Sequence, residues 1–178
     1  MQNKELHRIV STAIIYKDGP SFRQAQGKLS SGQAKYLITK RSPTKKVFSG
    51  KWTVPGGGLE TDDYVNTPKT TKDHWYFAIE KSLRREISEE VGLKVGKVNY
   101  LLDMTFIRPD GIPVVVLSYY CDYKSGKVRL SEESVDFKWV SLKEAKNYDL
   151  IEGIYEEIEM VDKVLKKGSI SGIKYRKK

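Results

Sequence analysis

The sequence predicts an α/β (α+β) fold in which helices cover both faces of a β-sheet. Residues 112–123 form a nearly unbroken apolar run, which is typical of a strand with a covering layer on each side. Residues 76–91 and 154–165 carry apolar side chains at three- and four-residue steps, as amphipathic helices do. These three segments together predict a sheet packed between helices.

The remaining elements follow from short apolar runs and turn residues. Strands are expected at 9–16, 36–39 and 98–107, and a short one ends at Val140. Residues 21–33 are polar and predict a long hairpin loop.

Capping patterns locate the helices. Thr70 and Asp73 have capping-box spacing, which predicts that the first helix begins near Lys72. Ser141 and Glu144 have the same spacing and predict a short helix over 142–147. The last helix is expected to end near Gly168.

Length and charge set broad limits on the class of protein. The 178 residues fit one domain, with a basic tail at 169–178, and the net charge of +9 favours anionic partners. Cys121 is the single cysteine, so no disulfide forms within the chain and a reducing compartment is expected. The sequence shows neither a membrane-spanning run nor a signal-peptide pattern, which predicts a cytoplasmic location without membrane association.

Three acids are clustered where a helix tolerates them least. Glu86, Glu89 and Glu90 share one face of the last turn before Gly92. Acids at a helix C-terminus are unfavourable by roughly 0.3–1 kcal/mol each, and like charges at these spacings cost roughly 0.2–0.5 kcal/mol per pair. Arg85 neutralises one of them, with Glu89 at i+4 as its expected partner. A divalent cation such as Mg²⁺ or Mn²⁺ would turn this repulsion into attraction.

Residues 55–63 and 85–93 resemble the two halves of the Nudix box, the motif of the Nudix pyrophosphohydrolases. The first half reads Pro-Gly-Gly-Gly-Leu-Glu-x-Asp-Asp, and the second reads Arg-Glu-Ile-x-Glu-Glu-x-Gly-Leu. The family usually has glutamate where Asp63 stands, and its spacer between the halves is shorter. The box therefore spans about 56–93, with an apparent insertion at about 64–75.

The resemblance implies a Nudix-type α/β/α sandwich around a mixed, curved sheet, formed by residues 1–178 as a single domain. It implies Mg²⁺-dependent (or Mn²⁺-dependent) hydrolysis of a phosphoanhydride bond in a nucleoside diphosphate linked to another moiety. The expected metal ligands are Glu86, Glu89, Glu90 and the carbonyl of Gly56. The expected catalytic residues are Glu86, Glu89, Glu90, Arg85 and Glu133, and substrate is expected to meet Arg41, Gly57 and Trp52.

The family resemblance leaves several alternatives open. The general base is either a glutamate of the box or a loop acid, Glu133 or Asp136. A nucleotide-sensing Nudix-fold module without catalytic activity is a second reading, because Asp63 and the interrupted box depart from the motif. An RNA 5′-end pyrophosphohydrolase is a third, suggested by the basic tail, and an isomerase is a fourth. A small nucleotide is the expected partner, with the leaving group and the oligomeric state unspecified.

Overall fold

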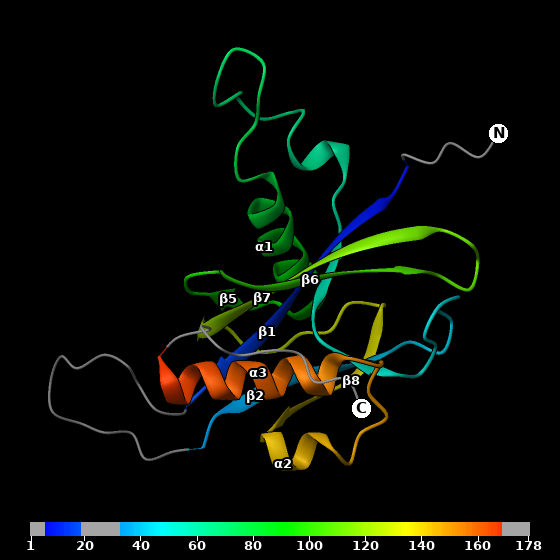
Figure 1. The fold of residues 1–178 in the computed structure, drawn as a ribbon, viewed down its shortest axis with the longest axis vertical. Coiled ribbons are helices and arrows are strands. Elements are labelled where there is room, and N and C mark those ends of the chain that lie inside the picture. The colour runs from blue at the N-terminus through cyan, green and yellow to red at the C-terminus, as the bar shows by residue number, and fades with distance from the viewer. Residues whose placement is uncertain (1–5, 19–32, 169–178) are drawn as a thin grey trace, which may run out of the picture.

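The computed structural model describes residues 6–18 and 33–168. One eight-stranded mixed sheet forms its centre (Figure 1). The strands are β1 (Arg8–Lys17), β2 (Lys35–Arg41), β3 (Trp52–Thr53), β4 (Gly56–Gly58), β5 (Lys94–Val95), β6 (Asn99–Ile107), β7 (Pro113–Ser125) and β8 (Ser134–Val140). The helices are the 3₁₀ turn η1 (Thr61–Asp63) and the α-helices α1 (Ala78–Val91), α2 (Leu142–Ala145) and α3 (Ile154–Lys167).

The sheet is mixed because its two central strands are parallel while the neighbouring pairs are antiparallel. Its main path runs β3-β2-β1-β7-β5, with β4 beside β1, β6 beside β7 and β8 beside β2. Strands β1 and β7 pair in parallel along nine residues, from Arg8 opposite Val114 to Tyr16 opposite Asp122. This pairing forms the rigid centre of the molecule.

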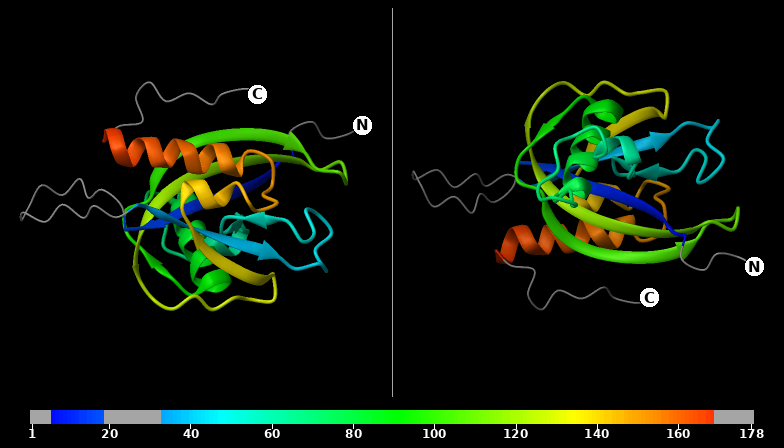
Figure 2. Two further views of the ribbon diagram at one scale, coloured as in Figure 1. Left: turned by 90° about the horizontal axis from the view of Figure 1, so that it is seen from below. Right: turned by 90° about the horizontal axis from the view of Figure 1, so that it is seen from above.

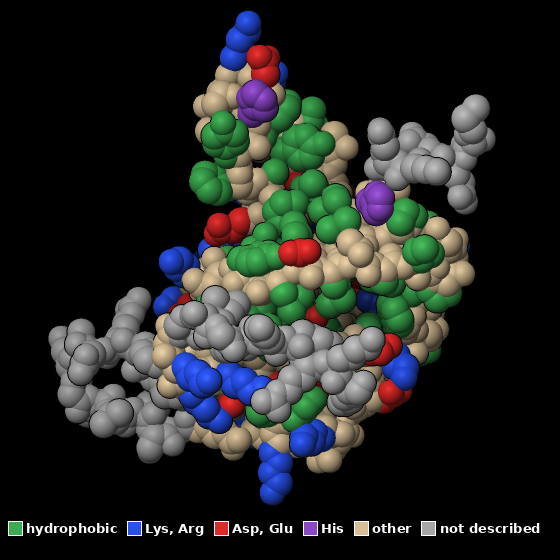
Figure 3. Space-filling view, in the orientation of Figure 1, with side chains coloured by type: hydrophobic (Ala, Val, Ile, Leu, Met, Phe, Trp, Pro, Cys, Tyr) green, Lys and Arg blue, Asp and Glu red, His purple; other side chains and the backbone are tan. Residues whose placement is uncertain are grey.

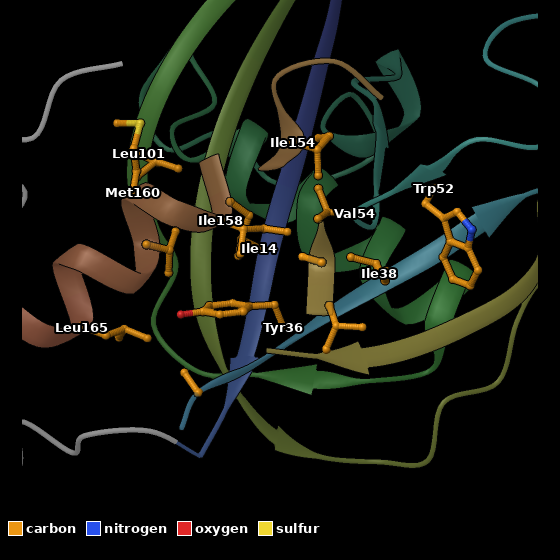
Figure 4. Close-up of a cluster of buried hydrophobic side chains, with 14 residues drawn as sticks. Ile14, Tyr36, Ile38, Trp52, Val54, Leu101, Ile154, Ile158, Met160 and Leu165 are labelled. Atoms are coloured by element: carbon orange, nitrogen blue, oxygen red, sulfur yellow. The ribbon is translucent and has the colours of Figure 1, made fainter. Parts of the chain in front are cut away.

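Alternating side chains on the central strands build two separate cores. Ala13, Ile15 and Leu37 face α1, where they pack with the helix side chains Leu83, Ile87 and Val91. Ile14, Tyr36 and Ile38 point to the other face, where they pack with Ile154, Ile158 and Val161 of α3 (Figure 4). The sheet therefore lies between α1 on one side and α3 with α2 on the other (Figure 2), which confirms the predicted α/β/α layers.

Two neighbouring strands of the sheet, β1 and β2, separate along part of their length. Strands β1 and β2 pair only at Tyr16–Tyr36 and Lys17–Lys35, and then diverge. Strand β4 fills the gap by pairing with Val10–Thr12 of β1. Gly56 has a φ of 152°, and a Cβ there would overlap the backbone of Ser11 and Thr12, so only glycine lets β4 approach this closely. The glycine segment is thereby held under the helix that carries the acids.

Most predicted elements are confirmed, with shifted ends. Strand β6 coincides with the predicted 98–107 apart from one residue, and β7 extends the predicted 112–123 at its C-terminal end. The predicted capping box at Ser141 is present, with both reciprocal hydrogen bonds, although the helix ends at Ala145. Most of the predicted hairpin loop at 21–33, like the tail at 169–178, lies outside the described residues.

The predicted start of the first helix is wrong. Residues 64–77 form an irregular segment, which we call the box loop, and α1 begins only at Ala78. Trp75 explains the difference, because its ring packs on Tyr64 and its Nε1–H donates to the carbonyl of Thr67 at 2.9 Å. Those contacts hold the chain out of helical geometry, and Tyr76, predicted on the apolar stripe, is 51% exposed.

None of the helices in the described residues is long and apolar enough to span a membrane.

Candidate active site

Helix α1 presents its acids from a firmly anchored position. Leu83, Ile87 and Val91 are completely buried against the sheet, so the helix cannot rotate without exposing them. Gly92 ends the helix in the left-handed conformation, with its N–H bonded to the carbonyl of Ser88. The three glutamates before Gly92 accordingly have fixed backbone positions, and their surroundings differ.

Glu90 is the most enclosed of the three acids. Its Oε2 accepts a hydrogen bond of 2.8 Å from the backbone N–H of Gly56. Burial raises the pKa of Glu90 to about 7, and the Gly56 hydrogen bond opposes that rise while Glu86 and Glu133 add to it. The helix end and the glycine segment are thus joined by one carboxylate that is costly to ionise in the absence of a cation.

Glu86 lies against the next glycine. A Cβ at Gly57 would overlap the carboxylate of Glu86, so this glycine provides the space that the acid occupies. The pKa of Glu86 is raised, mainly by burial, and the nearby carboxylates of Glu89 and Glu133 also raise it. Gly57, predicted to meet substrate, therefore shapes the position of an acid in this structure.

Arg85 is surrounded by carboxylates. It donates two hydrogen bonds to Asp63, of 2.5 Å from Nε and 3.0 Å from Nη2. It also pairs with Glu89 at 2.9 Å, the predicted i+4 partner, and with Glu86 at 3.1 Å. The Arg85 hydrogen bonds lower the pKa of Asp63 to about 2. Asp63, the residue that departs from the family pattern, still reaches Arg85 and orients it.

The three acids among the predicted metal ligands do not converge on one point. Glu89 turns toward Arg85 and its side chain is 59% exposed, whereas Glu86 and Glu90 lie at the glycine segment. Within residues 6–18 and 33–168, no group of three acidic, histidine or cysteine side chains is arranged to hold a metal ion. Glu86 and Glu90 nevertheless suit a divalent cation, because they offer hard oxygen donors that repel each other without one.

A loop before β8 brings another acid to the same place. The N–H of Ser131 bonds to the carbonyl of Glu90 at 3.1 Å, and the N–H of Ser42 bonds to the carbonyl of Glu133 at 2.8 Å. These bonds fasten the loop to α1 and to the end of β2. The Glu133 carboxylate forms an ion pair of 2.5 Å with Lys45. Asp136, the other candidate base, instead accepts from the N–H of Phe137 and does not line the pocket.

A cavity of about 610 Å³ lies along this face of α1. Acids dominate its lining, and the two cations among its lining residues are Lys81 and Arg85. The lining residues are Glu60, Asp62, Asp63, Thr67, Lys81, Arg85, Glu86, Glu89 and Glu133. A pocket of this size admits a nucleotide, and its acidity favours a ligand that arrives with metal cations.

None of the three residues predicted to meet substrate lines that cavity: Gly57 adjoins Glu86, as described above, and Trp52 and Arg41 lie elsewhere. Trp52 is 8% exposed and packs edge-to-face on Tyr148 in the core beside α3, which gives it a structural position. Arg41 donates to the carbonyl of Val47 at 3.2 Å and lies near enough to Glu90 to lower its pKa. Neither side chain lines the pocket, although the positive charge of Arg41 acts on Glu90, which lies at the glycine segment.

Sequence reasoning missed Lys81 and Thr67 as residues of this site, and it considered Lys45 only as a contact of phosphate and not as the partner of Glu133. Lys81 could have been found, because it precedes Arg85 by four residues and therefore shares its helix face. The position of Thr67 depends on the Trp75 hydrogen bond, and that of Lys45 on an ion pair across 88 residues of chain to Glu133. Neither contact has a periodic signal in the sequence.

Together, the acid-ended helix, the glycine strand and the α/β/α layers define a nucleotide pyrophosphohydrolase. The NUDIX domain model matches residues 29–160, and the chain belongs to the Nudix family. The predicted family, fold and enzyme class are therefore confirmed.

The comparisons with individual proteins agree with that assignment. The nucleoside triphosphatase NudI of Klebsiella pneumoniae (strain 342) is 32% identical over 132 residues, which cover 68% of this chain and 84% of that protein. The MutT protein of Methanosarcina mazei Go1 has the same fold, with a TM-score of 0.61 and 22% identity over 92% of this chain and 99% of that one. The NUDIX domain of Shewanella oneidensis NrtR, solved with ADP ribose, gives a TM-score of 0.62 at 14% identity over 93% and 90% of the two chains.

Proposed function

We propose that this protein hydrolyses a phosphoanhydride bond in a nucleoside diphosphate linked to another moiety. Water adds across one P–O–P bridge, so that one phosphoryl group gains the hydroxyl and the other leaves with the bridging oxygen. The observation that carries the proposal is the placement of Glu86 and Glu90 against Gly57 and Gly56, with Glu86 lining an acidic, nucleotide-sized cavity.

In this proposal Glu86 and Glu90 hold Mg²⁺ or Mn²⁺, with Glu89 and the Gly56 carbonyl as further ligands. A bound divalent cation supplies positive charge to the non-bridging phosphate oxygens and acidifies a water molecule. Arg85 acts on the acids and not on the substrate: held by Asp63, its guanidinium fixes the carboxylates of Glu86 and Glu89.

Glu133 is the loop acid best placed to accept the proton of the attacking water. It lines the same cavity as Glu86 and lies close enough to Glu86 and Glu90 to raise the pKa of both. Lys45 holds the Glu133 carboxylate in the present arrangement through their ion pair. Glu86 and Glu90 remain the alternative bases within the box.

The test is a hydrolysis screen with product analysis. The substrates are nucleoside triphosphates, ADP-ribose, nucleotide sugars, dinucleoside polyphosphates and NADH, each assayed with Mg²⁺, with Mn²⁺ and with EDTA. We expect cleavage of a phosphoanhydride that stops in EDTA. Thermal-shift binding of the same compounds without turnover of any of them would favour a nucleotide sensor instead.

Neighbouring acids give the screen a matched control. Glu133→Gln removes the proposed base, and Glu132→Gln removes an exposed acid one position away that does not line the cavity. We expect kcat to fall at least tenfold in the first variant and to remain unchanged in the second. Equal activity of the two variants assigns the base to the box.

The cytoplasmic location expected from the sequence is part of this proposal, because nucleotides of these classes are cytoplasmic metabolites.

A further inference from the structure

The active-site cavity continues past the catalytic acids toward the box loop. Lys81 and Thr67 line it together with Glu86 and Glu89. Lys81 precedes Glu86 by five residues of α1, which places it about 7 Å farther along the helix axis. The cavity therefore has room for a charged group beyond the phosphates that react.

The charge of Lys81 is available to a ligand. Of the two cations that line the cavity, Arg85 is already engaged by Asp63, Glu86 and Glu89. Within the described part of the chain Lys81 forms no ion pair, and its side chain is exposed. A lysine ammonium is a compact point charge with three donors, and it binds phosphate oxygens well.

The box loop gives this end of the cavity a fixed wall. Trp75 donates to the carbonyl of Thr67, and Tyr64 accepts a hydrogen bond of 2.7 Å from the Thr67 hydroxyl. The Tyr64 and Trp75 rings lie 5.4 Å apart, and Lys69 covers the Trp75 ring at 5.0 Å. Figure 3 shows the loop as a projection above the body of the molecule, with hydrophobic side chains gathered on it. Thr67 is thus held at the rim by contacts within the loop itself.

We infer that Lys81 binds the terminal phosphate of the substrate, the one that follows the second phosphorus, so that the cavity prefers nucleoside triphosphates to nucleotides with a sugar in that position. This inference rests on the proposed hydrolysis of a phosphoanhydride. Glu60 and Asp62 also line the cavity, and a lysine that merely balanced their charge would affect all substrates alike. Substrate preference therefore distinguishes a Lys81 that binds the terminal phosphate from a Lys81 that only balances the charge of the neighbouring acids.

ATP and ADP-ribose form a matched pair for the test. Both release AMP when the anhydride next to the adenosine phosphate is cleaved, and they differ in whether phosphate or ribose follows the second phosphorus. We expect Lys81→Met to lower the ratio of kcat/KM for ATP to kcat/KM for ADP-ribose by about tenfold, through KM. Lys81→Arg should retain most of the ratio. Lys97→Met, which removes an exposed lysine outside the cavity, should leave the ratio unchanged.

Binding of inorganic tripolyphosphate, measured by calorimetry in MgCl₂, supplies a readout that needs no turnover. We expect Lys81→Met to weaken it at least fivefold, with an unchanged Tm. An equal loss of kcat/KM on both nucleotides, or an unchanged tripolyphosphate Kd, overturns the assignment of Lys81. If the unaltered enzyme cleaves neither of these two nucleotides, the tripolyphosphate measurement alone decides the role of Lys81. The proposed hydrolysis itself fails only if no compound of the screen is cleaved.

Discussion

Helices α1 and α3 are both 14 residues long and pack on opposite faces of one sheet, yet they treat charge in opposite ways. Helix α3 has Glu156 and Glu157 in its first turn and Lys166 and Lys167 in its last, as the helix dipole favours. Helix α1 has acids in its last turn and no basic residue there. The comparison teaches that α3 is arranged for stability, whereas α1 gives up stability to hold negative charge at the glycine strand.

The largest expected effect comes from neutralising the enclosed acid of α1. Glu90→Gln keeps the shape of the side chain and removes the charge that the proposed cation requires. We expect kcat/KM to fall at least a hundredfold, a loss of about 2.7 kcal/mol or more, while the Tm stays level or rises because repulsion is relieved. Steady-state kinetics measure kcat/KM, and thermal unfolding measures the Tm. Parental turnover in a normally folded variant contradicts the proposed role of α1.

The corresponding acid of α3 should affect stability instead. Glu157 is 1% exposed, its Oε2 accepts from the Ser118 hydroxyl at 2.8 Å, and its Oε1 has no partner among the described residues. Burial raises its pKa to about 7, and the Ser118 hydrogen bond opposes that rise. Because the folded state favours the protonated acid, its stabilising contribution is complete below about pH 4.5 and is lost as pH rises through about 7.

Glu157→Gln cannot lose a proton, so it should remove that part of the pH dependence. We expect the difference in free energy of unfolding between variant and parent to grow by about 3 kcal/mol in favour of the variant between pH 4.5 and 8. Urea titrations at several pH values give this difference. Activity per folded molecule should not change. A constant difference across the pH range would show that the folded protein does not disfavour the charged form of Glu157.

A smaller effect is expected where the glycine strand meets α1. Gly57→Ala introduces a methyl group into the space of the Glu86 carboxylate. We expect kcat/KM to fall about tenfold, or about 1.4 kcal/mol, as Glu86 moves from its position. Gly50→Ala is the control for stability, since a Cβ there meets nothing, although its φ of 69° makes the substitution strained. Full activity in Gly57→Ala would show that Glu86 tolerates displacement.

The smallest effect concerns the residues that precede the two helices. Phe77 and Gly153 both have left-handed backbones, with φ of 62° and 92°, before α1 and α3. Glycine adopts this conformation without strain, whereas phenylalanine does not, and Phe77 is 75% exposed. Phe77→Asn should raise the free energy of unfolding by about 0.5 kcal/mol, and Gly153→Ala should lower it by about 1 kcal/mol. Chemical denaturation measures both, and a destabilised Phe77→Asn would show that the ring makes contacts that stabilise the fold.

Local patterns were sufficient for the layers of the fold. The spacing of Leu83, Ile87 and Val91 predicted the buried face of α1, and the apolar run at 112–123 predicted a central strand. Contacts between distant residues overrode local patterns elsewhere. Trp75 delays the start of α1, and Glu157 is buried although its residue type predicts exposure.

In the candidate site, too, the residues placed by local spacing were predicted and those placed by contacts between distant residues were not. The motif resemblance predicted Glu86, Glu90 and the glycines as a group, because their spacing is local to the box. Helix spacing predicted the Arg85–Glu89 pair, but the resemblance placed Glu89 among the metal ligands, and neither predicted that Asp63 would hold the guanidinium. The position of Trp52 depended on Tyr148, which is remote in the sequence and whose ring covers it in the core.

The glycine segment is a strand of the central sheet and not a surface loop. Gly56 is opposite Thr12 in the β1–β4 pairing, and the Thr12 hydroxyl contacts that of Ser118 on the strand beyond. The acid held by the Gly56 N–H is therefore connected to the central parallel strands β1 and β7 through one residue pair. Thermal inactivation should accordingly be abrupt, with catalysis and the β-sheet lost at one temperature and no inactive folded form accumulating on the way.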